Sequence, residues 1–246
     1  MTRSLGNGTV DVELGTGSWS ARWPGADVHA GPFRASIDVD GLGIDTRDAP
    51  GTWNVSAGSA FGRAGAWARW TARDGGIWLR LHVPADGALL VVEGGIRAEP
   101  EDTPGALVLA TGPFGIGSID DAAVPELRRL VGSREEPVWT GLAAEDASGS
   151  TGREALVVAA AAGAGAAFGL QALHGAEPVG TALTLVDGTR ASDRSTNSEI
   201  RVAVIDPRAG RVRGDAVRSE AVAFGAHRDP FALADALAAL ASRTSG

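Results

Sequence analysis

Short runs of alternating apolar and polar residues, broken by Gly, Pro, Asn and Asp, make up most of this sequence. Such runs are typical of β-strands with one buried face, and the interrupting residues are typical of turns. Asp40-Gly41 separates two such runs, 33–39 and 43–46, and an Asp-Gly pair in this position predicts a β-hairpin. No convincing helix of the length that parallel pairing requires lies between two runs. The sequence therefore predicts an all-β fold of antiparallel sheets.

The same pattern predicts roughly a dozen strands along the chain. Asp74-Gly75-Gly76 is expected to form a turn between two of them, and a glycine-rich turn near 163–165 is expected to join two buried strands. One short helix is expected at 124–131, where Pro125 suits a first helical turn. The other strands are expected at 9–14, 67–72, 77–83, 89–93, 106–110, 155–159, 167–173, 182–186, 200–205 and 216–224.

The last part of the sequence has the signals of an α-helix. Asp229 suits the N-cap, Pro230 suits the first turn, and Arg243 lies in the last turn. Leucines at helical spacing form an apolar stripe, namely Leu233, Leu237 and Leu240. This stripe must lie against either the sheets or a partner.

The charge balance and the missing residue types exclude several classes of protein. With 22 basic and 30 acidic residues, the net charge of −8 argues against binding to nucleic acid or to an anionic membrane. The absence of cysteine excludes disulfides and thiolate metal sites, and the absence of lysine excludes a Walker motif and a Schiff base. The amino-terminal residues lack the apolar stretch of a signal peptide, so a cytoplasmic location is expected. The uncharged stretch 155–173 is interpreted as two strands rather than a membrane span.

The acidic residues do not form the pattern of a catalytic or metal site. Four aspartates near the predicted hairpin fail the spacing of an EF-hand and are interpreted as solvated carboxylates: Asp38, Asp40, Asp45 and Asp48. The adjacent pairs Asp120-Asp121 and Glu135-Glu136 are interpreted as surface residues, because neighbours on a strand face opposite ways. No catalytic residue, metal ligand or cofactor is predicted.

Two aromatic residues are the candidates for carbohydrate binding, because aromatic rings stack on sugars. Trp53 lies in the stretch 49–54, which is interpreted as a loop, and it is the candidate for an exposed platform. A tryptophan in a loop also serves to pin the loop to a sandwich. Phe114 lies in the glycine-rich stretch 112–118, which allows either the close approach of a ligand or an awkward turn.

Three further tryptophans are assigned from strand alternation. Trp67 and Trp70 are expected on opposite faces of one strand, so that at least one of them lies in the core. Trp78 lies within an apolar alternation and is expected in the core as well.

The second half of the chain carries a resemblance to a known family. The segments that carry it are 131–139, 154–158, 167–170, 214–220 and 229–233. Over roughly residues 100–243, this succession resembles the amino-terminal domain of glycoside hydrolase family 36, the α-galactosidase group. The resemblance implies an all-β fold, a large antiparallel β-supersandwich with a single C-terminal α-helix. The supersandwich domain would span 1–228, and the helix in 229–246 would be a connector.

The resemblance also implies where chemistry would lie. In that family a catalytic (β/α)8 barrel follows the connector and carries the nucleophile and acid/base aspartates, so no catalytic residue can be assigned to this chain. With a barrel attached or supplied, the resemblance implies retaining hydrolysis or transfer of α-galactosides by two barrel carboxylates. A family loop that reaches the sugar site has its nearest counterpart in 112–118, which contains Phe114 but lacks the family's Tyr and Trp.

The sequence thus leaves three functional hypotheses. The first is a non-catalytic accessory domain that packs against a barrel domain or partner chain through its C-terminal helix, assists oligomerisation and lends Trp53 or Phe114 to a sugar site. The second is a stand-alone carbohydrate-binding module with exposed tryptophans. The third is a structural homo-oligomer without sugar binding, in which the leucine stripe around Leu237 is the exposed interface.

Overall fold

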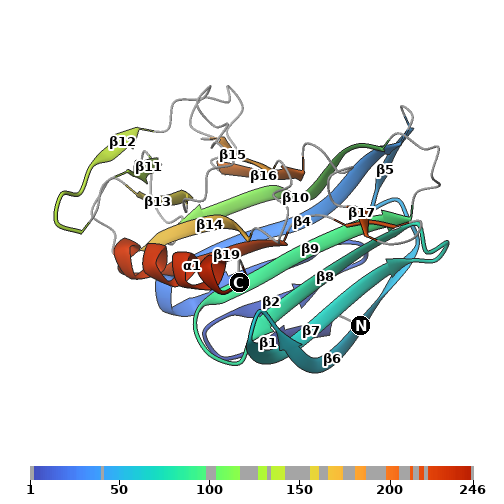
Figure 1. Ribbon diagram of the computed structural model, residues 1–246, viewed down its shortest axis with the longest axis horizontal. Coiled ribbons are helices and arrows are strands. Elements are labelled where there is room, and N and C mark those ends of the chain that lie inside the picture. Colours follow the sequence, from blue (N-terminus) through green and yellow to red (C-terminus); the bar gives the residue numbers. More distant parts are fainter. Residues whose placement is uncertain are drawn as a thin grey trace.

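In the part of the chain that the computed structural model describes, the fold consists of two antiparallel β-sheets and one α-helix (Figure 1). The predicted all-β fold with a single C-terminal helix is confirmed. One sheet has eight strands and the other has eleven, and we call them the small and the large sheet. The structure describes residues 3–39, 42–97, 104–116, 127–131, 134–141, 156–160, 166–173, 181–186, 198–204, 211–212, 216–218 and 221–244.

The small sheet combines the first strands of the chain with later ones. A short 3-10 helix, η1 (Pro24–Ala26), joins the third strand to the fourth. One strand, β5 (Leu42–Asp45), pairs with β4 outside the main order. The order of the others is β1 (Arg3–Gly6), β2 (Asp11–Leu14), β3 (Trp19–Trp23), β4 (Val28–Val39), β10 (Pro104–Ile116), β16 (Ser198–Val204) and β15 (Thr181–Val186).

The large sheet also mixes early and late strands. Outside its main order, β18 (Ala216–Arg218) pairs with β9 and β17 (Arg211–Val212) pairs with β18. The order of the others is β12 (Trp139–Gly141), β11 (Leu127–Leu130), β13 (Leu156–Ala160), β14 (Ala167–Leu173), β19 (Ala221–His227), β9 (Leu89–Arg97), β8 (Ile77–Pro84), β7 (Arg63–Ala72) and β6 (Gly51–Ala60).

Aromatic side chains from both sheets meet in the core between them. Trp19 of the small sheet lies edge-on to Phe224 of the large sheet, with ring centroids 5.6 Å apart. Phe114 of the small sheet stacks on Phe168 of the large sheet at 5.2 Å. All four side chains are almost fully buried. Because such rings bury large apolar areas, these contacts are a main source of stability for the sandwich.

The hairpin and turn predictions agree with the observed pairing. Val39 of β4 lies opposite Leu42 of β5, as the predicted hairpin requires, while Asp40 and Gly41 themselves lie outside the described residues. Between β7 and β8, the Asp74 carboxylate accepts a hydrogen bond from the Gly76 amide at 2.9 Å. Gly75 in the same turn has φ +75°, a conformation that favours glycine.

The prediction of a short helix at 124–131 is wrong for residues 127–130, which the structure describes. Residues 127–130 form strand β11, which pairs with β12 on one side and with β13 on the other. Pairing with two neighbours satisfies the backbone of this segment and overrides its local helix signal. The strand expected at 216–224 is divided into β18 and β19.

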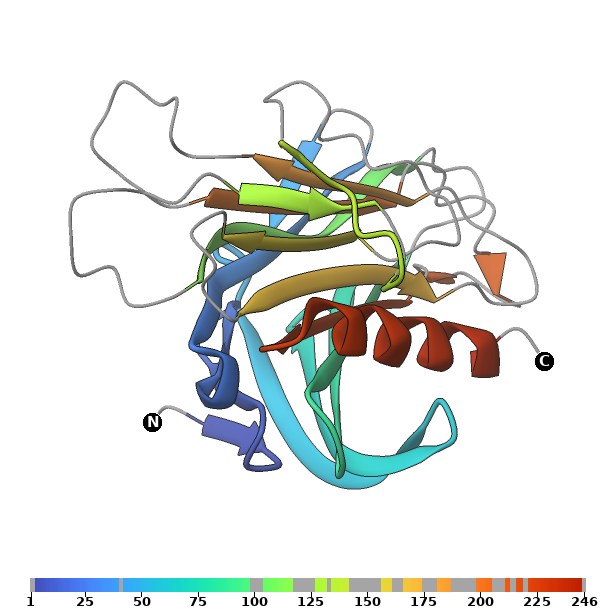
Figure 2. The same cartoon turned by 90° about the vertical axis from the view of Figure 1, so that its left-hand side faces the viewer.

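The C-terminal helix α1 (Pro230–Thr244) forms as predicted and lies on the outer face of the large sheet (Figure 2). The Asp229 carboxylate caps it by accepting hydrogen bonds from the amides of Phe231 and Ala232, at 2.9 and 3.3 Å. Its leucine stripe packs on β13, β14 and β19, and all three leucines are at most 2% exposed. The stripe is therefore covered by the chain's own sheet, and the hypothesis of an exposed leucine interface is wrong.

Two glycines in the sheet allow α1 to approach closely. A Cβ atom on Gly169 would lie 2.9 Å from Cδ1 of Leu237, and one on Gly225 would lie 2.8 Å from Cδ1 of Leu233. A larger residue at either position would force these leucine side chains to shift. The role of 229–246 as a connector, distinct from a domain at 1–228, stays a prediction.

Candidate functional site

Trp53, the predicted sugar platform, lies in strand β6 rather than in a loop. It faces Trp70 across the β6–β7 ladder and is 7% exposed. Its indole Nε1 donates a hydrogen bond to the Gly15 carbonyl at 2.8 Å, and its own carbonyl accepts one from Arg3. The expectation of an exposed platform is therefore wrong, because the ring ties the β2–β3 turn to the large sheet. A role of this side chain in sugar binding stays a prediction that its burial does not favour.

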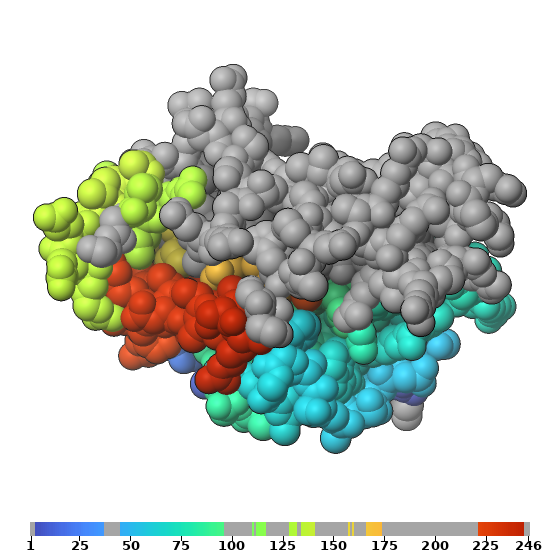
Figure 3. Space-filling view, viewed as in Figure 1, coloured from blue at the N-terminus to red at the C-terminus, as the bar shows by residue number. Residues whose placement is uncertain are grey.

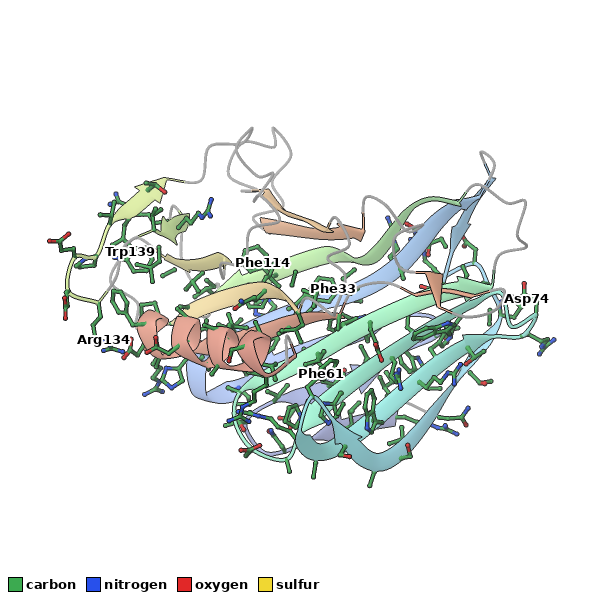
Figure 4. All side chains as sticks on the ribbon, viewed as in Figure 1. Phe33, Phe61, Asp74, Phe114, Arg134 and Trp139 are labelled. Atoms are coloured by element: carbon green, nitrogen blue, oxygen red, sulfur yellow. The ribbon has the colours of Figure 1, made fainter. Side chains whose placement is uncertain are left out.

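Phe114 is likewise a core residue. It lies within the long strand β10 (Figure 4) and is 1% exposed. Its ring stacks on that of Phe168. The glycines around it belong to the strand: a Cβ on Gly112 would lie 2.7 Å from the Phe33 ring. In the described part of this stretch, 112–116, the glycines therefore allow β10 and β4 to pack closely. A sugar contact by Phe114 stays a prediction, and the position of its ring does not favour it.

The other tryptophans divide between the two faces of the large sheet. Trp70 is fully buried in the core, and Trp67 lies on the outer face, as alternation predicts. The expectation that Trp78 lies in the core is wrong. Leu79 and Leu81 take the inward positions of β8, so the alternate residue Trp78 faces outward and is partly exposed.

The outer face of β7, β8 and β9 carries a cluster that we call the arginine–tryptophan face. It lies on the part of the sheet beside α1, and Figure 3 shows the neighbouring surface of β6 and β7 in cyan next to the red helix. Cross-strand register brings Arg69 opposite Arg80, and Arg80 opposite Glu93. The members of the face are Trp67, Arg69, Trp78, Arg80, His82 and Glu93.

The guanidinium groups of this face lie against its indole rings. The Arg80 guanidinium carbon is 4.7 Å from the centroid of the Trp67 ring and 5.7 Å from that of the Trp78 ring. Arg69 lies 5.6 Å from the same Trp78 ring. Such cation–π contacts hold the arginine side chains in place while their edges keep hydrogen-bond donors.

Both indole rings are packed down onto glycines of the neighbouring strands. A Cβ on Gly58 of β6 would lie 2.8 Å from Trp67, and a Cβ on Gly95 of β9 would lie 2.6 Å from Trp78. The His82 ring lies 4.6 Å from the Trp67 ring at 31°. The rings thus have sheet backbone, imidazole or guanidinium against them.

Two charged or polar side chains lie deep in this face. Glu93 is 2% exposed and forms an ion pair with Arg80. His82 is 1% exposed, and neither ring nitrogen has a hydrogen-bond partner within the described part of the chain. Burial lowers the pKa of His82 below its usual value; Glu93 opposes this effect, and the positive charges of Arg63 and Arg80 add to it. Burial thus favours the neutral form of the His82 ring.

The sequence contains a signal for this face in its strands rather than in its loops. The patterns Trp67-Ala-Arg69 and Trp78-Leu-Arg80-Leu-His82 place like side chains at alternate positions of two predicted neighbouring strands. With the turn at Asp74 these strands pair, and their outward residues meet on one face. Only the partner Glu93 depends on the third strand and its register.

The described residues do not form a metal site or a membrane-spanning helix. Among them, no group of three or more His, Asp or Glu side chains is placed to hold a metal ion. Within the same part of the chain, no helix is both long and apolar enough to cross a membrane. Asp45 of the predicted carboxylate hairpin pairs with Arg34 at 3.2 Å.

Comparison with known proteins gives a likeness in fold. No protein-family profile matches the sequence, and no curated protein matches it. The alpha-N-acetylgalactosaminidase NagBb from Bifidobacterium bifidum, in its GalNAc complex, matches with a TM-score of 0.59 and 9% identity over 93% of this chain. A Glycoside Hydrolase Family 97 enzyme from Pseudoalteromonas sp. strain K8, in complex with acarbose, matches with a TM-score of 0.53 and 8% identity over 92% of this chain.

The match covers only part of these proteins. In both cases the chain spans 36% of the length of the matched structure. Both are glycosidases by name, whereas the likeness does not single out family 36. At these identities the likeness concerns the fold alone: this chain has the β-sandwich architecture of a segment about one third as long as each of these two glycosidases.

Proposed function

We propose that this chain is a non-catalytic β-sandwich module of a glycosidase, with the catalytic residues supplied by a further domain or by a partner chain. The observation that carries the proposal is the asymmetry of the fold match. It covers nearly all of this chain but about a third of the N-acetylgalactosaminidase and of the family 97 enzyme. Most of each glycosidase therefore has no counterpart in the 246 residues.

The chemistry of the described residues supports a non-catalytic role. A glycosidase needs two carboxyl groups that are free to reach the glycosidic bond. Glu93, the most buried carboxylate of the described residues, is held by Arg80, and Asp45 is held by Arg34. Both carboxylates therefore form ion pairs with arginines of the sheets.

The finer assignment rests on the sequence. We propose the α-galactosidase group of family 36 as the family, because the succession of segments over 100–243 resembles its amino-terminal domain. A barrel or partner chain at the C-terminal helix would then contact its solvent side, where Ala238 and Ala239 are exposed, since the leucines are covered. Any homo-oligomer likewise requires a surface other than the leucine stripe.

The test uses an antibody against the chain and extract of the cells in which the protein occurs. The proposal predicts a polypeptide well above 24.9 kDa, or a co-precipitating partner. The precipitate would hydrolyse nitrophenyl α-galactosides or α-N-acetylgalactosaminides, while the purified 246-residue chain would hydrolyse none. Hydrolysis by the purified chain, or a precipitate without any glycosidase activity, would contradict the proposal.

A second candidate function is a stand-alone carbohydrate-binding module. The arginine–tryptophan face favours it, since this face presents hydrogen-bond donors on a rigid sheet. A native mass of 24.9 kDa together with saturable sugar binding would select this candidate over the first.

A further inference from the structure

The arginine–tryptophan face lies on strands of the large sheet that α1 does not cover. The helix packs on β13, β14 and β19, whereas this face lies on β7, β8 and β9. Phe61, at the end of the β6–β7 hairpin, lies at the boundary (Figure 4): it packs against the cluster beneath α1 and is 6.5 Å from the His82 ring. The face is therefore separate from the surface that α1 covers, and Phe61 marks the boundary between them.

The indole rings of this face do not offer a stacking platform. Glycine backbone lies beneath Trp67 and Trp78, and guanidinium or imidazole groups lie against the same rings. A sugar ring would have to displace these contacts in order to stack. The groups that remain available are the edges of the guanidinium groups, whose N–H donors match a carboxylate in a planar, two-bond geometry.

The charges on the face favour the binding of an anion. Arg69 and Arg80 lie directly opposite each other on β7 and β8, and like charges in this position repel. Glu93 neutralises Arg80 from its buried side. Arg69 is exposed and has no ion pair with any described residue, so one positive charge is unbalanced. This positive charge stands out in a chain of net charge −8.

Short polar side chains border Arg69 on the edge strand β6. Asn54 lies opposite Arg69, and Ser56 lies opposite Trp67, so all four share one face of the sheet. Asn54 and Ser56 are exposed. An amide and a hydroxyl next to Arg69, with Arg80 on the following strand, match a ligand that has both a carboxylate and hydroxyl groups.

We propose that the arginine–tryptophan face binds an acidic saccharide, a sugar chain that carries uronate carboxylates. The carboxylate lies on the outward N–H groups of Arg69 and Arg80, and sugar hydroxyls contact Asn54 and Ser56. The tryptophans hold the guanidinium groups in position rather than stacking on the sugar. This inference rests on the proposed carbohydrate-related function and names the ligand class for a site separate from Trp53 and Phe114.

The test is calorimetric titration of the 246-residue chain with trisaccharides of galacturonate and of glucuronate. A neutral galactose trisaccharide and a hexapeptide of glutamate are the comparison ligands. We expect saturable binding of at least one uronate, weakened by added salt, with weak or no binding of the comparison ligands. Arg69→Gln should weaken uronate binding about tenfold, since it removes a charge-assisted contact.

The matched control is Arg22→Gln, which removes an exposed strand arginine from the small sheet and should leave the affinity unchanged. The inference is overturned if neither uronate binds, if the neutral trisaccharide binds as well, or if Arg69→Gln has no effect. Glutamate peptide binding with the same Arg69 dependence would overturn it in favour of an acidic protein partner. Each result is independent of the precipitation assay, so glycosidase activity without uronate binding would refute this inference alone.

Discussion

Asn7 joins the two sheets through its side-chain amide. Its Oδ1 accepts hydrogen bonds from the amides of Thr9 and Val10 and from the Thr9 hydroxyl, at 2.8 to 2.9 Å. Its Nδ2 donates to the carbonyls of Pro84 and Gly87, at 2.7 and 2.8 Å. One amide group thus fixes the β1–β2 turn and attaches it to the β8–β9 turn of the opposite sheet.

Replacement of Asn7 by Asp should destabilise the protein. The carboxylate keeps the acceptors but places a negative charge against two carbonyl oxygens, so both donated bonds are lost. We expect the free energy of unfolding to fall by about 2 kcal/mol, measured by urea denaturation. Asn54→Asp is the control, because Asn54 is exposed, and it should change stability by less than about 0.5 kcal/mol. Equal effects of the two changes would refute the role of Asn7 as a link between sheets.

His82 should make stability depend on pH. Because its pKa is lowered in the folded protein, the unfolded chain takes up a proton first as the pH falls below the usual value of 6.5. The effect of His82 on the free energy of unfolding is therefore constant above that pH, and it lowers this free energy below it. Unfolding in urea at pH 7.5 and 5.5 should show a smaller loss for His82→Gln than for the original chain. The same loss in both proteins would show that His82 does not contribute.

At the scale of single elements, α1 shows how a sequence pattern and a sheet surface act together. The leucine spacing fixes which side of the helix is apolar, and Gly169 and Gly225 give this side room to approach the sheet. Leu237 is fully buried and lies against Gly169. The helix is thus part of the hydrophobic structure of this chain.

Leu237→Ala should lower the free energy of unfolding by about 3 kcal/mol, because it leaves a cavity under the helix. The neighbouring change Ala238→Ser, on the exposed side of α1, should have little effect. Gel filtration at low denaturant would show whether Leu237→Ala also changes the oligomeric state. A change in oligomeric state without loss of stability would restore the leucines as an interface.

The elements that sequence reasoning identified are those with strong local signals. Capping by Asp229 and the spacing of the leucines identified α1, and alternation identified β7 and β8. The misassigned elements depend on pairing with other strands. Pairing with β7 makes β6 a strand and buries Trp53, and pairing with β12 and β13 makes 127–130 a strand. Register between strands, which local pattern does not encode, also decides which side chains meet Arg80.

At the scale of the whole molecule, both sheets join early strands of the chain to late ones. In the small sheet, β10 lies between β4 and β16, and in the large sheet β19 lies between β9 and β14. The last described strand of the chain therefore occupies an interior position. Its neighbours bury Phe224 against rings of both sheets.

A chain that ends at residue 220 should not fold. It lacks β19, so β9 and β14 lose their shared neighbour and expose apolar faces and backbone groups. We expect loss of the near-ultraviolet circular dichroism signal of the core tryptophans, together with aggregation. A chain that ends at Arg243 retains β19 and the leucines of α1, and it should keep this signal. A soluble, cooperatively unfolding product from the first truncation would contradict the assigned order of strands.

The interior position of β19 has a consequence for synthesis. A ribosome makes the chain from the amino terminus, so β9 and β14 leave it long before the strand that unites them. The large sheet can close only when residues 221–227 have emerged, and the apolar faces of its strands stay exposed until then. We expect the nascent chain to depend on chaperones, and any domain translated downstream would give β19 time to emerge while the ribosome is still attached.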